Sequence, residues 1–575
     1  MTALPELTRR AVLTGMLLGA LLTPCNVYSG LKIGWSFNMS ITAGLLGFAF
    51  WQALAPLGVR GLGLHENNIN QTTASSAASI ISSGLVAPIP ALTLVTGGTL
   101  PFTLLALWVF AVSVLGIVVA AGLRNQMLLR ERLPFPAGVA TAETMRQIHA
   151  SGAEAAARVR LLLGAGALAG AVKLIDALRY ALPRPALPVT LPGGAGAGQL
   201  GFVLDPSLLM LGFGAIIGLR AGLSLLFGAL LAWGALGPLV LTRGWLASPP
   251  EPAAARWFGP LVEWLLWPGV SLMIVAALTS FVISLGRLYR RRRQGRGQGS
   301  APAILAPRVF VLALTAALGV VILAQMRIFE ISWWAAGLAA LLSFVLAVVA
   351  ARVSGETGIT PIGAMGNMTQ LAYGALTPGD LTANLMSANV TGGAAGQCAD
   401  LMHDLRTGQI IGATARLQLL AQLFGVLVGS LVGSLVYLLL IPDPASMLVT
   451  AEWPAPAVAT WAAMAQVLAE GWSAAPTGAP VAALIAGAAG LALALVERLA
   501  PARLARWLPS APALGLAFII PAWNSLTLCL GAGLAAALWR LRPGWAARRT
   551  ITLAAGLVAG ESLAGVAIAT GRMLG

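Results

Sequence analysis

One stretch of the sequence holds an unusual density of side chains that could bind a polar solute. From His65 to Ser83 the chain reads HENNINQTTASSAASIISS, with long apolar runs on both sides. Asn, Gln and Thr supply neutral hydrogen-bond donors and acceptors, which suit peptide groups or chelates. Polar side chains in a membrane core are costly unless they face a protein interior or a wet cavity. We therefore favour a polar site within the membrane thickness over an external loop with a helix starting at Ala74.

A second polar stretch lies in the other half of the sequence. Gly355 to Leu371 and Asn384 to Gly408 are too polar and too rich in Gly for helices that face lipid. Transporters built from two repeats place unwound, polar segments at corresponding positions of both halves, beside the substrate. We therefore expect both stretches to be unwound and to line one central cavity. The predicted substrate-binding residues are Asn67, Asn68, Asn70, Gln71, Asn367, Gln370, Asn389, Thr391 and Gln397.

Carboxyl groups in these stretches are candidates for carrying a coupling proton. Burial disfavours the charged form of a carboxyl, so Asp or Glu in a membrane cavity can change protonation near neutral pH. The predicted proton-coupling residues are Glu66, Glu356 and Asp400, with Glu561 next in line.

The alternative for each carboxyl is an ion pair with a nearby cation. Arg60 and Arg352 are such partners for Glu66 and Glu356. For Asp404 we favour a pair with Arg406, two residues away. Lys173 and Asp176 lie on one helix turn, and we expect them to neutralise each other.

Composition points to a membrane protein that crosses the bilayer many times. The chain has 575 residues, of which 58% are hydrophobic and only 9% charged. Its long continuous apolar runs exclude an outer-membrane barrel, whose strands alternate. The net charge of +16 fits Arg-rich cytoplasmic loops rather than nucleic-acid binding. Only two lysines occur, Lys32 and Lys173, and three distant cysteines form no metal-ligand spacing, so we expect no cofactor and no metal site.

The order of apolar runs predicts an all-α fold with about fourteen to sixteen crossings. Arg9 and Arg10 precede a first helix, which places the N-terminus in the cytoplasm. Pro88 and Pro90 predict a broken or re-entrant helix after the first polar stretch. Two pseudo-repeat halves are expected, with a basic cytoplasmic linker between them. The predicted division is residues 1–288, linker 289–306 and residues 307–575.

Several segments also match a known family, in the same order along the chain. They are RRAVLTGMLLGALLTPCNVYSGLKIG near the N-terminus, ENNINQTTASSAAS at Glu66, LPFPAGVATAETM at Leu133, ARVSGETGITPIGAMGNMTQL, DLMHDLRTGQIIGATARLQ, and GLVAGESLAGV near the C-terminus. With these segments the chain resembles the oligopeptide transporter family, which includes the yellow-stripe-like metal-chelate carriers. The resemblance runs from residue 9 to about residue 570.

The resemblance implies a proton-coupled secondary transporter of about sixteen helices, not an enzyme. It would import small oligopeptides or peptide-like metal chelates across the inner membrane of a bacterium. His65 and His403 stand alone, so metal would have to travel already chelated. Its expected partners are membrane lipid, the substrate and protons, with a homodimer left open and no nucleic acid. The alternatives are a membrane-embedded transferase acting on lipid-linked substrates, and a channel.

Overall fold

Every regular element of the described chain is helical. Pairing between extended segments is limited there to two isolated bridges, Ala186–Val203 and Leu448–Trp453. Thirteen helices of the described chain are long and apolar enough to cross a membrane. The predicted all-α, multi-pass fold class is therefore confirmed. The computed structural model describes residues 6–34, 38–186, 188, 196–246, 257–293, 304–358, 360–471, 475–501, 505 and 507–574.

The chain packs into two compact units, each built from segments of both sequence halves. Unit 1 comprises Met1–Val27, Ser36–Arg160 and Ser284–Pro442, and unit 2 comprises Tyr28–Trp35, Leu161–Ile283 and Asp443–Gly575. The packing therefore does not follow the predicted division at residues 289–306, because each half contributes one long segment to each unit. That the two halves are repeats stays a prediction. The predicted linker begins inside a helix that ends at Arg293, and its residues 294–303 lie outside the described ranges.

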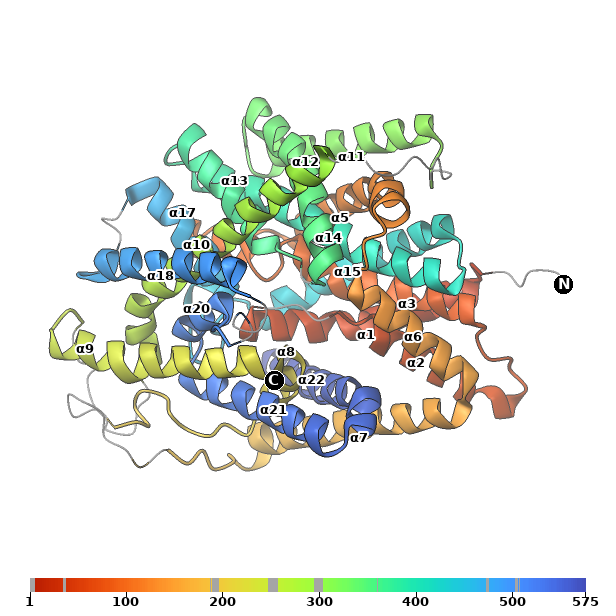
Figure 1. Ribbon diagram of the computed structural model, residues 1–575, viewed down its shortest axis with the longest axis horizontal. Helices are drawn as coiled ribbons and strands as arrows, with labels where there is room; N and C mark the ends of the chain where they lie inside the picture. Colours follow the sequence, from red (N-terminus) through yellow and green to blue (C-terminus); the bar gives the residue numbers. More distant parts are fainter. Residues whose placement is uncertain are drawn as a thin grey trace. The chain divides into compact units, whose positions relative to one another are not determined.

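Unit 1 is a bundle of helices around α14, seen near the centre of the labelled group α5, α12, α14 and α15 in Figure 1. Helix α14 contacts α3, α4, α5, α6, α12, α13 and α15. The α-helices of this unit are α1 (Arg9–Ile33, as far as Val27), α2 (Ser40–Ala53), α3 (Leu64–Ala78), α4 (Pro88–Thr96), α5 (Phe102–Arg124), α6 (Pro136–Ala150), α11 (Pro307–Ile328), α12 (Trp333–Thr357), α13 (Ile362–Leu376), α14 (Leu381–Ile411) and α15 (Ala415–Leu440). Short 3-10 segments cover Ala55–Leu57 and Ser79–Ser83, and a π-helical turn covers Asn125–Arg130.

The first polar stretch forms a broken helix, as predicted. Helix α3 gives way to the 3-10 segment at Ser79, and the chain turns at Gly84, whose φ of +121° is open to glycine alone among the common residues. Helix α4 then begins at Pro88, whose fixed φ and missing N–H suit a first helical turn.

Only part of the second polar stretch is unwound, which corrects our expectation for the rest. Gly355 to Leu371 is interrupted, since α12 ends at Thr357, Gly358 has φ +79°, and α13 begins at Ile362. Asn384 to Gly408 lies wholly within α14, a continuous helix of 31 residues. The Asp380 side chain caps its N-terminus by accepting a hydrogen bond from the Ala383 N–H at 2.8 Å, and Gly412 ends it at φ +84°. Because other helices surround α14, its polar side chains face protein rather than lipid, and the backbone has no need to unwind.

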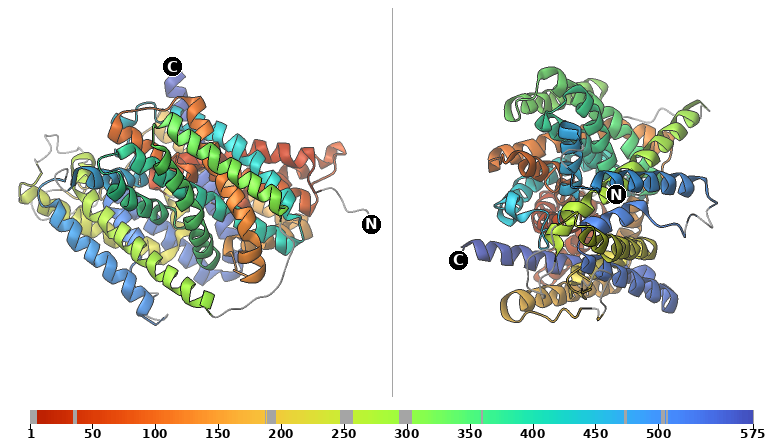
Figure 2. Two further views of the ribbon diagram at one scale, coloured as in Figure 1. Left: turned by 90° about the horizontal axis from the view of Figure 1, so that it is seen from above. Right: turned by 90° about the vertical axis from the view of Figure 1, so that its left-hand side faces the viewer.

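Unit 2 is organised around α8, which packs against α20, α21 and α22. Helices α10 and α18 run side by side, as the left view of Figure 2 shows, with the Ser271 hydroxyl donating to the Ala483 carbonyl at 2.7 Å. The helices of this unit are the end of α1, α7 (Gly152–Leu174, from Leu161), a π turn (Ile175–Arg179), α8 (Leu208–Ala229), a π segment (Leu230–Leu236), α9 (Gly237–Thr242), α10 (Phe258–Arg293, as far as Ile283), α16 (Pro444–Met447), α17 (Pro456–Glu470), α18 (Ala479–Leu499), α20 (Ala511–Ile519), α21 (Ala522–Leu541) and α22 (Pro543–Leu574).

Two local breaks in unit 2 have direct sequence causes. Helix α8 departs from helical geometry at Gly218, with φ +83° and ψ 167°, a backbone conformation that glycine adopts without a steric cost. Helices α20 and α21 are separated at Pro521, because proline lacks the N–H that a continuous helix would need there. The second break places Asn524 in the first turn of α21.

Glycines on α15 allow close packing against α3, and this generates a stability prediction. A Cβ at Gly425 would lie 2.2 Å from the Thr73 carbonyl oxygen, and one at Gly429 would lie 2.5 Å from the Ala77 carbonyl oxygen. Gly425→Ala and Gly429→Ala should each destabilise the protein by about 1–3 kcal/mol, because backbone must shift to admit the methyl group. The apparent unfolding temperature of the purified protein in detergent measures the change.

Gly319→Ala on α11 is the matched control, since a Cβ there meets nothing within 4 Å. It should leave the unfolding temperature unchanged or raise it slightly, because Ala has the higher helix propensity. Equal effects of all three substitutions would contradict the close approach of α3 and α15.

Candidate functional site

The two predicted polar stretches meet inside unit 1. Every residue of α3 from Glu66 to Ala78 is buried, as is nearly all of α14. Gln71 Nε2 donates to Asp404 Oδ1 at 2.7 Å, and Asn389 Nδ2 donates to the Ser83 carbonyl at 3.0 Å. We call the buried polar side chains of α3, α14 and the helices packed on them the polar core. That this core forms a substrate cavity stays a prediction.

Asp404 is held by neutral donors, so its predicted pair with Arg406 is wrong. Its side chain is 2% exposed, and Oδ1 accepts hydrogen bonds from Gln71 and, at 3.3 Å, from the Ser40 hydroxyl. Its Oδ2 atom has no hydrogen-bond partner in the described chain. Arg406 is partly buried on this helix and donates instead to Gln409 at 2.8 Å. Positions two residues apart on a helix face different directions, which explains why these two groups do not meet.

Glu66 forms an ion pair at the start of α3. Arg10 contacts both carboxylate oxygens, at 2.9 Å from Nε and 2.5 Å from Nη2, and Arg60 lies 3.5 Å away. The Thr8 hydroxyl and the Gly63 N–H also donate to this carboxylate. Glu66 therefore caps a helix N-terminus and is neutralised by arginine, which is the alternative that the sequence left open.

Glu356 and Asp400 have different surroundings from each other. Glu356 lies 3.9 Å from Arg352, one turn earlier on α12, and its side chain is 41% exposed. Arg352 also pairs with Glu131. Asp400 is one turn before Asp404 on α14, at the edge of the polar core, and no ion pair to it is present in the described residues. Of the three predicted proton carriers, Asp400 alone is not paired with an arginine there.

Asn67 and Asn70 attach α3 to α2. Asn67 Nδ2 donates to the Gly44 carbonyl at 3.1 Å, and Asn70 Nδ2 donates to the Ala43 carbonyl at 3.4 Å. Asn67 Nδ2 also lies 3.2 Å from Nε2 of His149 on α6. Burial lowers the pKa of His149 to about 4, so at neutral pH the uncharged ring can accept this hydrogen bond. These contacts give both asparagines a role in packing.

Asn389 and Thr391 attach α14 to its neighbours in a similar way. Trp108 Nε1 on α5 donates to Asn389 Oδ1 at 2.6 Å, while the other end of this amide contacts Ser83. The Thr391 and Thr369 hydroxyls lie 2.7 Å apart and link α14 to α13. The predicted binding residues of this group are therefore already occupied by protein partners.

Five predicted binding residues keep a polar side-chain atom without a protein partner in the described chain. For Asn70 and Gln71 this is the amide oxygen alone, since their amide nitrogens are bonded. Both amide atoms of Asn68 and of Gln397 lack a hydrogen bond in the described chain, as does Asn367 Oδ1, and all three side chains are at most 4% exposed. Buried amides without partners are uncommon, because each loses its hydrogen bonds to water on folding. Gln370 is buried in the same region, where its carbonyl accepts from Asn384 Nδ2 at 2.8 Å.

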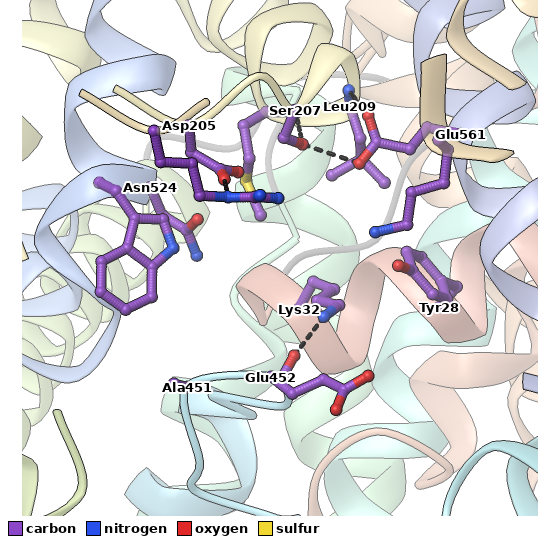
Figure 3. A pocket seen from close by; sticks show the side chains of 13 residues that line it. Tyr28, Lys32, Asp205, Ser207, Leu209, Ala451, Glu452, Asn524 and Glu561 are labelled. Atoms are coloured by element: carbon purple, nitrogen blue, oxygen red, sulfur yellow. Dashed lines mark hydrogen bonds and ion pairs between the residues drawn. The ribbon is translucent and has the colours of Figure 1, made fainter. Parts of the chain in front are cut away.

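Unit 2 contains a cavity that the sequence did not predict. Its volume is about 370 Å³. Figure 3 shows Glu561 on one side of this cavity, Asn524 on the opposite side, and Lys32 below them. Its lining combines three cations with three carboxylates: Tyr28, Lys32, Lys173, Arg184, Asp205, Ser207, Leu209, Met210, Ala451, Glu452, Trp523, Asn524 and Glu561. We call it the mixed-charge cavity.

Arg184 is the most fully paired cation of this cavity. Its guanidinium contacts Asp176 at 2.7 Å and Asp205 at 2.8 Å. Hydrogen bonds to these two carboxylates raise the pKa of Arg184 above its usual value. The predicted pair of Lys173 with Asp176 is therefore wrong, because the loop after α7 brings Arg184 to the aspartate instead.

Sequence reasoning missed most of the cavity but contained one signal for it. The two lysines of the whole chain, Lys32 and Lys173, both line this cavity, although 141 positions (173 − 32) separate them. In a chain whose other basic residues are all arginine, this choice of side chain marks them out. Nothing in the local sequence indicated that α1 and α7 would place them together.

The polar core and the cavity are found in a chain with a clear family match. The sequence profile described as OPT oligopeptide transporter protein matches residues 6–571. The chain belongs to this family. The resemblance seen in the sequence motifs is thus confirmed over nearly the whole chain, and the family consists of transporters, which supports a non-enzyme role.

Individual relatives come from fungi, plants and bacteria. A putative oligopeptide transporter of Saccharomyces cerevisiae, YGL114W, is 24% identical over 73% of this chain and 76% of its own length. A probable metal-nicotianamine transporter of rice, YSL9, is 25% identical over 97% of this chain and 88% of its own length. A putative oligopeptide transporter of Haemophilus influenzae is 32% identical over 37% of this chain and 32% of its own length.

The contacts of Glu66 predict that its loss affects folding rather than turnover. Glu66→Gln should lower the free energy of unfolding by about 1–3 kcal/mol, because it leaves Arg10 without a counter-charge and weakens the cap of α3. We expect less monodisperse protein after purification in detergent and a lower unfolding temperature. Transport per folded molecule should remain close to that of the wild type.

Glu356→Gln serves as the matched control, since its carboxylate is partly exposed and 3.9 Å from its arginine. It should change the unfolding temperature little, as expected of an exposed pair. A Glu66→Gln protein of normal stability that no longer responds to a proton gradient would overturn the structural role and restore Glu66 as the coupling group.

Proposed function

We propose that this protein is a secondary active transporter that uses a proton gradient to import small oligopeptides or peptide-like metal chelates. Family membership supports transport, and the relatives are named as oligopeptide or metal-nicotianamine transporters. The observation that carries proton coupling is the pair of carboxyls on α14, Asp400 and Asp404, for which no ion pair with Lys or Arg is present in the described residues.

Asp404 has the surroundings expected of a group that changes protonation. A buried carboxylate without a cation is costly in its charged form. Two neutral donors offset part of that cost at Oδ1, while Oδ2 lacks a partner in the described chain. In the protonated form the carboxyl becomes a donor itself. When water reaches this site during a transport cycle, the Asp404 carboxyl would bind a proton from it or release one to it.

This proposal transfers the coupling role from Glu66 and Glu356 to the α14 carboxyls. Both glutamates lie within ion-pair distance of arginines, at 2.5 Å for Glu66 and 3.9 Å for Glu356. Asp400 keeps the role predicted for it, beside Asp404. Glu561 is treated separately below, since it lines the cavity of unit 2.

Among the predicted binding residues, we assign contact with a solute or with water to Asn68, Asn367 and Gln397. Their partnerless amide atoms can still form hydrogen bonds. The remaining residues of the set hold the core helices in register: Asn67, Asn70, Gln71, Gln370, Asn389 and Thr391.

The setting of the transporter follows from the sequence predictions. We propose that it lies in the inner membrane of a bacterium, with the N-terminus and residues 289–306 in the cytoplasm. A homodimer remains compatible with this arrangement.

Uptake into proteoliposomes tests the function. With an acidic exterior, labelled trialanine or the nickel(II) complex of nicotianamine should accumulate above its external concentration, and a protonophore should abolish this. Asp404→Asn should lose gradient-driven accumulation while exchange of internal for external substrate persists, because Asn cannot carry the proton but keeps the acceptor for Gln71.

Glu330→Gln, at an exposed carboxyl of unit 1, is the control and should accumulate substrate like the wild type. Equilibration without accumulation would indicate a channel, and chemical change of the substrate would indicate an enzyme. Normal accumulation by the Asp404→Asn and Asp400→Asn proteins would remove the coupling site from α14.

A further inference from the structure

The mixed-charge cavity contains a carboxylate that neutral donors hold in place, while the Lys173 ammonium shares the cavity with it without forming an ion pair in the described residues. Glu561 on α22 is 6% exposed and accepts hydrogen bonds from the Ser207 hydroxyl at 2.9 Å and the Leu209 N–H at 2.6 Å. These donors belong to the N-terminus of α8, whose dipole favours a negative charge. The described residues contain no ion pair to this carboxylate, so it can take a cationic group from a ligand.

Two ammonium groups of the cavity are also available. Lys173 makes no hydrogen bond or ion pair in the described chain, although it lines both the large cavity and a smaller adjoining one with Glu561. Lys32 donates to the Glu452 carbonyl and lies 4.6 Å from the Trp453 ring centroid and 5.6 Å from that of Tyr28. A carbonyl and two ring faces orient an ammonium but do not neutralise it.

A neutral amide side chain lines the cavity together with these charged groups. Asn524, in the first turn of α21 after the break at Pro521, is 5% exposed and lines the cavity. Its side chain has no hydrogen-bond partner in the described residues, and Figure 3 shows it across the cavity from Glu561. A buried amide of this kind requires a ligand or water to satisfy it.

We propose that this cavity binds a small zwitterion that carries a free amino group and at least one free carboxylate. Lys173 and Lys32 hold the carboxylate, Glu561 holds the ammonium, and Asn524 bonds an amide or carboxyl group between them. The volume of about 370 Å³ lies within the usual range of small-ligand pockets. Arg184 takes no direct part, because Asp176 and Asp205 already occupy its guanidinium.

This inference rests on the proposed function, since both a short peptide and an aminocarboxylate chelator carry these groups. It adds the site that binds the amino group and the carboxylate of such a ligand, and it explains why the cavity contains both positive and negative side chains. A ligand with one charge only would leave either the lysines or the glutamate without a partner, at a cost in affinity.

Blocked peptides test the inference on the wild-type protein. Isothermal titration calorimetry on the purified full-length chain in detergent should show trialanine binding about tenfold more tightly than N-acetyl-trialanine or trialanine amide. Each blocked peptide lacks one terminal charge. This comparison needs no substitution, so it holds even where a variant fails to fold.

Variants then assign the charges to residues. Lys173→Met should weaken trialanine binding about tenfold but leave binding of the C-terminal amide nearly unchanged, because both changes remove the same contact. Glu561→Gln should weaken trialanine binding about tenfold but leave binding of N-acetyl-trialanine nearly unchanged, because both changes remove the contact with the ammonium group. Lys32→Met provides a second test of the carboxylate contact. Glu263→Gln, at an exposed carboxyl of α10, is the control and should bind like the wild type.

A second set of titrations distinguishes the source of the zwitterion. Nicotianamine and its nickel(II) complex are titrated beside trialanine into the wild type and Lys173→Met. Weaker binding of trialanine, nicotianamine or its nickel(II) complex to Lys173→Met than to the wild type supports the site. The ligand that binds the wild type more tightly shows whether the natural zwitterion is a peptide or a chelate.

Equal affinity for the three peptides, Lys173→Met and Lys32→Met proteins that bind like the wild type, or no binding of any probe would overturn the inference. These results are separable from failure of transport. Gradient-driven uptake that is intact in both lysine variants would remove this site while leaving the proposed function in place.

Discussion

The structure depends on one constraint: a polar side chain buried in a membrane protein must find its hydrogen-bond partners within the protein. The contact between α3 and α14 meets this requirement for unit 1. Gln71 and Ser40 satisfy one oxygen of Asp404, and Asn389 satisfies the Ser83 carbonyl exposed by the break after α3. Small residues on α15 then allow the backbone of α3 to be enclosed on its other side.

Both units use a helix terminus to hold a carboxylate, but with different consequences. In unit 1 the N-terminus of α3 holds Glu66, and Arg10 neutralises it, so the group fixes the fold. In unit 2 the N-terminus of α8 holds Glu561 in a cavity where the described residues supply no paired cation. The same electrostatic device thus stabilises structure in one case and leaves a charge available for a ligand in the other.

The buried carboxyls illustrate how spacing along the chain misleads about partners. Asp404 and Arg406 are close in sequence, yet they point away from each other on α14. Asp176 lies one turn from Lys173 but pairs with Arg184, which reaches it from the following loop. In both cases a long-range or loop contact decided which group bonds the carboxylate, a neutral donor for Asp404 and an arginine for Asp176, and neither is encoded in local periodicity.

The sequence by itself determined the fold class, the family and the position of the helix breaks at Pro88 and Pro521. These follow from hydropathy, motif order and the missing N–H of proline, all of which act locally. It also identified the polar residues that had to be buried. Only the tertiary structure decided that the units interleave both halves of the chain, that α14 stays continuous, and which amides keep free hydrogen-bonding atoms. Only the fold, too, brought Lys32 and Lys173 into one cavity, because the packing of distant helices sets which side chains share a space.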